Sequence, residues 1–229
     1  MNIVGIDPSL TSTGMCINGK YFFNYAKESY MYNKSGLNKW YKLCEDKIKY
    51  RVVDSMEKSV KDFTDSEINK LLIYEKITNQ ISKDIYTHID RDKDIRIYIE
   101  GYSYSNNFGP LIDLVTLGTL LRLKMLNITN YVNILPPSTL KLETAKMTYK
   151  GVKEKSKIVY RNNEGTSGGA FNKHDMYKSI IENKHEDKWV NFLKEIKDDV
   201  LSSKKIQKPI EDVNDSYLLY RVGELLSKK

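Results

Sequence analysis

Short apolar runs near the N-terminus, each closed by a turn signal, predict three strands. They are expected at residues 3–7, 13–17 and 20–25. The dipeptide Asn18-Gly19 between the second and third runs favours a tight hairpin turn, because both residue types tolerate positive φ. These strands are therefore expected to form an antiparallel meander.

Farther along the chain, the apolar positions change to a helical spacing. A helix is predicted over residues 66–86, with Asp65 as a possible N-cap, from the recurrence of Ile68, Leu71, Leu72, Ile77 and Ile81. An apolar strand is expected at 95–100, an apolar helix from about Pro110 to Met125, and a further strand at 131–135.

Two segments are less regular and are interpreted as insertions in a single domain that spans residues 1–229. Residues 28–64 are polar and weakly periodic, and residues 158–208 contain two polar helices, around 174–182 and 188–201. A meander followed by alternating helices and strands predicts an α/β fold, with a five-stranded mixed sheet and helices on both faces. This is the element order of the ribonuclease H-like fold.

The amino-acid composition indicates which kinds of partner to expect but does not identify one. The 229 residues are 40% apolar, enough for one substantial core, and carry a net charge of +7 with a pI near 9.1. This balance favours a polyanion such as nucleic acid, although a lysine-rich solvated surface gives the same number. Two cysteines without metal-ligand spacing, and no leader or membrane segment, predict a soluble cytoplasmic protein that is not secreted and has no membrane partner.

Four carboxylates stand at distinctive places in this pattern. Asp7 and Glu100 each end an apolar run, and Asp212 and Asp215 open the C-terminal amphipathic stretch. If the two runs are neighbouring strands, all four side chains can meet. Oxygen ligands suit Mg²⁺, and two such ions about 4 Å apart can activate water and stabilise a leaving oxygen. A metal-dependent nuclease is therefore the leading interpretation.

Each carboxylate also has a simpler explanation. Asp7 could cap a turn, and Asp212 and Asp215 could complement the dipole of a first helical turn. Glu100 is harder to dismiss, because a carboxylate that ends a buried strand is costly unless it is paired or metal-bound. The combination, more than any single residue, favours the metal site.

Several motifs together resemble the RuvC family of Holliday junction resolvases. They are Gly5-Ile-Asp7-Pro-Ser-Leu-Thr-Ser-Thr-Gly14, the strand-ending glutamate, Glu154-Lys155-Ser156 and the terminal Asp-x-x-Asp. The resemblance implies a homodimeric crossover junction endodeoxyribonuclease that nicks four-way DNA junctions symmetrically. It also implies two Mg²⁺ or Mn²⁺ ions per active site, bound by the four acids. The extra lengths and the lysine, asparagine and tyrosine content resemble a phage or viral member.

The same resemblance suggests roles for basic residues. Lys141 and Lys155 match positions where relatives place lysines near the scissile phosphate, so Lys155 is expected to assist catalysis and Lys141 to bind DNA. Lys153, beside that motif, is also expected to bind DNA. For each lysine, an ordinary surface position is the alternative.

Aromatic and apolar residues follow Glu100 directly. Tyr102, Tyr104 and Phe108 are expected to stack on unpaired bases, with core packing or a dimer seam as the alternative. The helix over residues 111–121 is apolar around most of its circumference, which favours burial in the core or against a second subunit.

Two other function classes stay open. Actin-like ATPases and kinases share an N-terminal strand, aspartate and Ser/Thr/Gly turn, but normally duplicate the fold, for which 229 residues leave little room. A branched-DNA-binding protein without catalysis is the other alternative, and the intact acids count against it. ATP hydrolysis would favour the first, and junction binding without nicking would favour the second.

Overall fold

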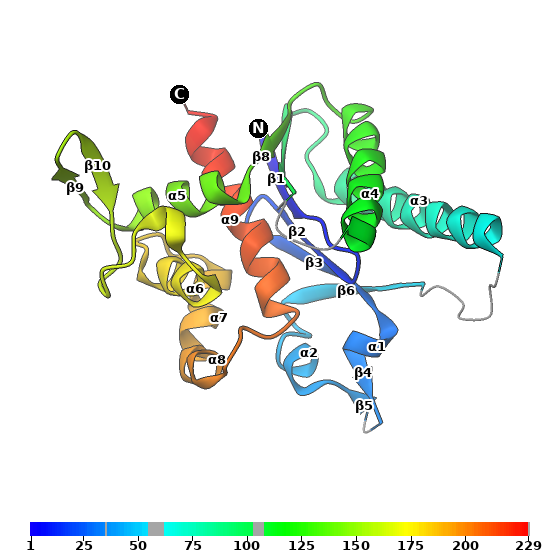
Figure 1. Cartoon of the computed structure of the whole chain (residues 1–229), viewed down its shortest axis with the longest axis horizontal. Coiled ribbons are helices and arrows are strands. Elements are labelled where there is room, and N and C mark those ends of the chain that lie inside the picture. The colour runs from blue at the N-terminus through cyan, green and yellow to red at the C-terminus, as the bar shows by residue number, and fades with distance from the viewer. Residues whose placement is uncertain (35, 55–61, 103–107, 229) are drawn as a thin grey trace.

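A six-stranded mixed sheet lies at the centre of the protein (Figure 1), seen in a computed structural model that describes residues 1–34, 36–54, 62–102 and 108–228. The strand order is β6-β3-β2-β1-β7-β8. These strands are β1 (Asn2–Asp7), β2 (Ser12–Ile17), β3 (Tyr21–Lys27), β6 (Ile48–Val53), β7 (Ile95–Glu100) and β8 (Val132–Leu135).

The directions of the strands place the carboxyl ends of five of them at one edge of the sheet. Only β2 is antiparallel to its neighbours, whereas β7 is parallel to β1, β8 to β7 and β6 to β3. Asn18 and Gly19, both at positive φ, turn the chain between β2 and β3 as predicted. The carboxyl ends of β1 and β7 therefore lie side by side.

The predicted α/β architecture, a mixed sheet with helices on both faces, is confirmed, but the expected five strands are six. The added edge strand, β6, lies in the segment 28–64, which was expected to hold only loops and short helix. Its pattern is hard to recognise because Ile48 and Val53 are buried while charged residues lie between them. Arg51 on this strand forms a bidentate ion pair with Asp84, at 2.8 and 3.0 Å, and so ties the edge to a helix.

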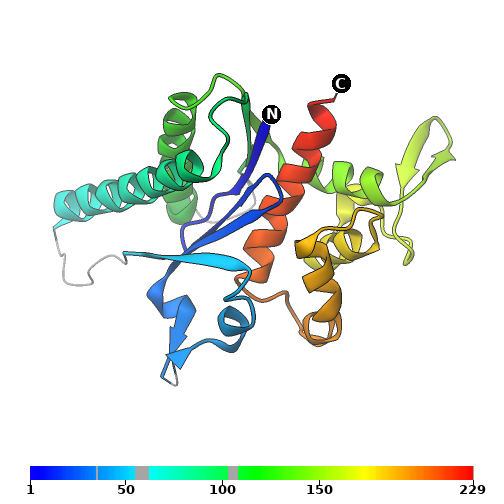
Figure 2. The same cartoon turned by 180° about the vertical axis from the view of Figure 1, so that it is seen from behind.

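The helices lie on both faces of the sheet, as expected (Figure 2). One face is covered by α3 (Phe63–His88) and α4 (Phe108–Leu126), whose apolar side chains pack on Val4, Ile6 and Met15. The N-cap of α3 is Asp62, whose side chain accepts from the backbone of Thr64 and Asp65, and not Asp65 as predicted. Within the described part of the chain, no helix is long and apolar enough to cross a bilayer.

The opposite face is covered by α9 (Ile210–Leu226), against which α5 (Pro137–Thr148) and the predicted C-terminal insertion (residues 158–208) pack. The helices of that insertion are α6 (Lys173–Glu182), α7 (Lys188–Glu195), α8 (Lys197–Ser202) and the short η1 (Gly168–Ala170). Trp189 of α7 donates to Asn214 of α9 at 3.1 Å, and Tyr217 donates to Asp187 at 2.7 Å. The insertion is thus held directly against α9.

The remaining elements are short. They are α1 (Glu28–Met31), β4 (Tyr32–Asn33), β5 (Gly36–Leu37), α2 (Lys39–Leu43) and the hairpin of β9 (Gly151–Glu154) and β10 (Lys157–Tyr160). The hairpin was not predicted from the sequence, which is strongly polar there and has little apolar alternation.

Two glycines allow the backbone of α9 to lie directly on the sheet. A Cβ atom at Gly5 would come within 2.1 Å of the Ser216 carbonyl oxygen, and one at Gly14 within 2.1 Å of the Asp212 carbonyl oxygen. Any larger residue would push the helix away from β1 and β2. These contacts place the first turn of α9 beside the carboxyl end of β1.

We predict that Gly14→Ala destabilises the protein by about 1–3 kcal/mol, because a methyl group there overpacks the strand–helix contact. Chemical denaturation should show a lower midpoint with little change in slope. The matched control is Gly169→Ala, since a Cβ at Gly169 meets nothing within 4 Å. Equal stability of the two variants would contradict the close approach of α9.

Candidate active site

Asp7 and Glu100 form a carboxyl pair across two neighbouring strands. They are the last residues of β1 and β7, whose parallel register pairs Ile6 with Ile99 immediately before them. Burial, followed by the charge of Glu100 and a hydrogen bond between the two carboxyls, raises the pKa of Asp7 well above its usual range. Burial also raises the pKa of Glu100. The pair therefore favours one shared proton over two adjacent negative charges.

Asp215 joins this pair from the first turns of α9. The residue is only 2% exposed, and burial raises the pKa of its carboxyl to about 7, with the charge of Asp7 acting in the same direction. Asp215 in turn raises the pKa of Glu100. Three carboxyls from three elements thus repel one another within one electrostatic cluster.

Asp212 lies one turn earlier and is held in a separate hydrogen-bond network. Its Oδ2 atom accepts from Ser12 Oγ at 2.5 Å and from Asn24 Nδ2 at 3.0 Å, while Oδ1 accepts from Lys208 Nζ at 2.7 Å. Burial raises the pKa of Asp212, and Lys208 acts to lower it. Asp212 still adds to the negative charge that raises the pKa of Asp7.

Lys173 supplies the positive charge at the centre of the cluster. Its ammonium group forms an ion pair with Asp215 and lies 3.7 Å from Glu211 Oε1. Its charge lowers the pKa values of both Asp7 and Glu100. Burial alone would lower the pKa of Lys173, but Asp215 and Asp7 raise it by more, so this lysine is protonated at neutral pH.

The donor chemistry of the four acids fits a divalent cation, because all their ligand atoms are carboxylate oxygens. Within the described ranges, however, no group of three or more Asp, Glu, His or Cys side chains is arranged to hold a metal ion directly. Lys173 and Lys208 bind the oxygens of Asp215 and Asp212 that a cation would share. Metal binding in this site would therefore require these lysine contacts to change.

The other residues predicted to bind DNA or act in catalysis lie in different places. Lys141, on the first turns of α5, is close enough to Glu100 to lower the pKa of that carboxyl. Lys153 lies in β9, and Lys155 lies in the exposed turn that follows it. Lys155 is thus exposed in the hairpin, whereas Lys173 forms an ion pair with one of the predicted acids, Asp215.

Sequence reasoning missed Lys173, although a local signal existed. Asn172 and Asp175 form a reciprocal capping box, which fixes the start of α6 at Lys173. This motif predicts a helix start but says nothing about its distance from Asp7. Only the packing of the insertion against α9 brings the side chain to the acids.

The predicted stacking residues are only partly described. Tyr102 packs against α4, donating from its hydroxyl to the Val115 carbonyl at 3.2 Å, with the Arg122 guanidinium 4.3 Å from its ring centroid. Tyr104 lies outside the described residues, and so does the side chain of Phe108. The ring of Tyr102 is thus already partnered by α4.

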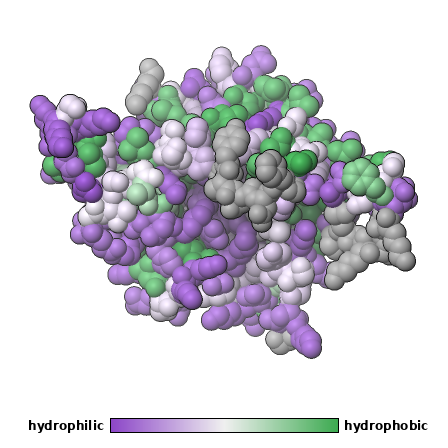
Figure 3. Space-filling view, viewed as in Figure 1, coloured by the Kyte–Doolittle hydropathy of each residue, from purple (hydrophilic) through white to green (hydrophobic). Residues whose placement is uncertain are grey.

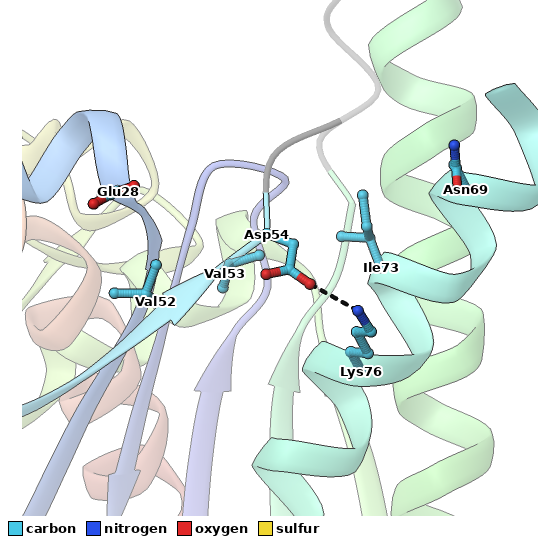
Figure 4. A pocket seen from close by; sticks show the side chains of 7 residues that line it. All are labelled: Glu28, Val52, Val53, Asp54, Asn69, Ile73 and Lys76. Atoms are coloured by element: carbon cyan, nitrogen blue, oxygen red, sulfur yellow. Dashed lines mark hydrogen bonds and ion pairs between the residues drawn. The ribbon is translucent and has the colours of Figure 1, made fainter. Parts of the chain in front are cut away.

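A pocket of about 470 Å³ lies beside the end of β6 (Figure 4), and none of the four candidate metal-binding carboxylates lines it. It lies between β6 and α3, and its charged pair is Asp54 and Lys76, 2.9 Å apart and both exposed. Three strand intervals separate β6 from β1, or about 14 Å at the usual spacing. The candidate chemistry therefore belongs to the acid cluster and not to this pocket.

Comparison with solved structures finds similar backbones. One is RuvC of Thermus thermophilus, with a TM-score of 0.47 and 11% identity, covering 99% of this chain and 97% of that one. Another is the yeast mitochondrial Holliday junction resolvase Ydc2, with a TM-score of 0.34 and 12% identity, covering 96% and 76%. No family model and no curated protein matches the sequence.

We predict that Asp7→Asn raises the melting temperature at pH 8 by several degrees. The folded pKa of Asp7 lies above the unfolded value of about 3.9, so its contribution to stability falls as pH rises through the folded pKa. The neutral amide removes this penalty and can donate to Glu100. The gain should shrink between pH 8 and pH 5 in calorimetric scans.

Asp84→Asn is the control, for which a change in melting temperature of the opposite sign is expected. Burial acts to raise the pKa of Asp84, but hydrogen bonds from Arg51, Gln80 and Tyr25 lower it below its usual value. Its stabilisation is present above the unfolded pKa and is lost as pH falls through the folded one. Asp84→Asn should therefore lower the melting temperature at pH 8, and a lower value for Asp7→Asn as well would contradict the proposed repulsion.

Proposed function

We propose that this protein is a structure-selective DNA endonuclease that resolves four-way junctions by paired, symmetric phosphodiester hydrolysis. The observation that carries the proposal is the mutual repulsion of Asp7, Glu100 and Asp215 at one edge of the sheet. Asp215 is buried and Asp7 and Glu100 are half-buried, and carboxyls are rarely packed together in this way without a cation to share. The chain is also basic overall, with a net charge of +7. Both features suit a site that binds cations and a polyanion together.

Asp7, Glu100, Asp212 and Asp215 are the residues that would hold Mg²⁺ or Mn²⁺, with two ions per active site. Such ions, when bound, activate water and neutralise charge on a scissile phosphate. Glu211, whose Oε1 lies 3.7 Å from Lys173 Nζ, adds a further carboxylate beside these acids. The role of the four side chains is to fix the position of that chemistry relative to the DNA backbone.

Two lysines complement the acids. The charges of Lys173 and Lys141 both lower the pKa of Glu100. The side chain of Lys173 is 45% exposed. A DNA phosphate that enters the site offers Lys173 an alternative anion to Asp215. We therefore assign Lys173 the role of stabilising negative charge on the phosphate, which sequence reasoning gave to Lys155.

The proposal includes a homodimer, because symmetric nicks need two active sites related by a two-fold axis. One face of α4 packs in the core through Leu117, Leu121 and Met125. The other carries a stripe of exposed apolar residues at helical spacing, formed by Ile112, Val115, Leu123 and Leu126, each 38–62% exposed. A second copy of α4 would cover this stripe.

The opening turn does not favour the ATPase alternative. Thr13 Oγ1 donates to the Ser9 carbonyl at 3.0 Å, and Ser12 Oγ donates to Asp212. Both hydroxyls are thus engaged inside the protein and are not directed at a bound phosphate. A binding protein without catalysis would have no use for these mutually repelling acids.

We predict that Asp7→Asn lowers the rate of junction nicking by at least about 10²-fold while leaving junction binding largely intact, since only a ligand and not the basic surface is lost. Lys173→Gln should lower the rate by about 10²-fold. The assay uses strand-labelled four-way, three-way, flap and linear DNA with Mg²⁺ or Mn²⁺. Paired nicks confined to the four-way substrate are expected.

Lys20→Gln is the matched control for Lys173→Gln. Lys20 is exposed and follows the β2–β3 turn at the opposite end of the sheet, so its loss should leave nicking unchanged. Full activity of Asp7→Asn would refute the site. Hydrolysis of ATP with no nicking would instead support the actin-like alternative.

We predict that Leu123→Glu converts a dimer to a monomer, because a charge cannot be buried against the stripe of a second copy. Sedimentation equilibrium measures the change. Leu43→Glu, at a residue of similar type that is 42% exposed on α2, should leave the dimer intact. A monomeric wild-type protein, or a dimer that tolerates Leu123→Glu, would show that the stripe is not the interface.

A further inference from the structure

The β9–β10 hairpin projects from the body of the protein at the side remote from α3. Figure 1 and its reverse view in Figure 2 both show it extending beyond the helices of the insertion. Residues 150–158 are all exposed, whereas Tyr160 at the base packs against the core beside Gly151. The hairpin is thus anchored at one end and free along its length.

We propose that this hairpin is a second DNA-contacting element, which inserts into the groove of a duplex arm and binds its phosphates. The hairpin lies apart from the carboxylate cluster, and we assign it no role in the cleavage step. The identity of the partner as DNA rests on the proposed function. The location and mode of contact rest on the hairpin alone.

The hairpin carries a concentrated and uncompensated positive charge. Four exposed lysines lie within eight residues, and among the contacts of the described residues none of them has an acidic partner; they are Lys150, Lys153, Lys155 and Lys157. The one acid, Glu154, is already neutralised by a bidentate pair with Arg161, at 2.9 and 3.1 Å. Figure 3 shows this projection as mostly hydrophilic. Phosphates would relieve the repulsion among the ammonium groups.

The register directs these charges to both faces of the ribbon. Lys157 pairs with Glu154, and Lys153 pairs with Ile158 in the next position of the ladder. Because successive pairs face opposite sides, Lys157 and Lys153 lie on opposite faces, with Lys155 at the turn. A surface that docked flat on a membrane or a protein would need its charge on one face. A groove with phosphates on both walls matches the observed distribution, and the major groove, about 12 Å wide, admits a two-stranded ribbon.

The conformation of the β9–β10 turn also indicates that the charge of Lys155 has a function. Lys155 has a φ of 53°, in the left-handed region where a non-glycine residue costs roughly 1 kcal/mol. Glycine or asparagine would form this turn more readily. A lysine there places an ammonium group at the farthest point of the projection, where it can contact a phosphate.

The hairpin is suited to duplex DNA more than to a single strand. Proteins that bind single strands generally stack bases on exposed aromatic rings. Residues 150–158 contain no aromatic residue, and the ring of Tyr160 is half-buried at the base. The exposed apolar side chains are the small Val152 and Ile158, which offer no stacking platform.

The test compares three variants of the full chain by their affinity for linear duplex and for a four-way junction across a salt series. They are Lys153→Gln/Lys155→Gln/Lys157→Gln, the same positions changed to Arg, and the control Lys20→Gln/Lys83→Gln/Arg91→Gln. The control residues are exposed at the end of the sheet opposite the carboxylates, and the net charge change is identical. The Arg variant preserves the charge and detects a fault in folding.

Three lost phosphate contacts should lower the slope of log affinity against log salt by about 2–3, and weaken binding in 0.1 M salt by at least about tenfold. The Arg variant and the control should stay within about twofold of the wild type. An unchanged slope for the Gln variant would overturn the proposal, as would an equal loss in the control.

The outcome separates this inference from the proposed function. Wild-type protein that binds duplex through the hairpin but nicks no junction would refute the nuclease and leave the hairpin standing. Paired nicking together with an unchanged salt slope in the Gln variant would support the nuclease and refute the role of the hairpin. Wild-type protein that binds no DNA would overturn both.

Discussion

The direct contact between the backbone of α9 and the first two strands is the constraint on which the site depends. Gly5 and Gly14 place no side chain between the sheet and the helix, so the carbonyl oxygens of Ser216 and Asp212 lie only 2.1 Å from where Cβ atoms on these two glycines would be. The first turn of the helix then reaches the carboxyl end of β1. A spacer of one methyl group would separate acids that now act on one another.

This packing concentrates negative charge in a place that water reaches poorly, which opposes folding. The pKa values of Asp7, Glu100 and Asp215 all rise because burial penalises their charged forms. Lys173 and Lys208 offset part of the penalty from outside the sheet. Functional sites commonly keep such unfavourable clusters because their chemistry needs them, and the stability comes from the core instead. The C-terminal insertion therefore contributes to the site as well as to the packing of α9.

The sequence predicted the parts of this arrangement that depend on local pattern. Strand-ending Asp7 and Glu100 followed from apolar runs, and parallel pairing then made them neighbours. Lys173 could not be found in this way, since its place depends on how an irregular insertion folds back over 42 residues to Asp215. The β6 strand was missed because an edge strand with few buried positions lacks a clear apolar alternation. Lys155 was assigned to catalysis from a motif alone; the structure places it in an exposed hairpin turn, and its role stays a prediction.

Anomalous scattering from a crystal grown with Mn²⁺ examines the carboxylate cluster directly. Density for the ion between the end of β1, the end of β7 and the first turn of α9 is expected, with Asp7 and Asp215 among its ligands and Lys173 moved off Asp215. Crystals soaked at millimolar Mn²⁺ that show no anomalous peak near these acids, with Lys173 still paired to Asp215, would contradict a divalent-cation site.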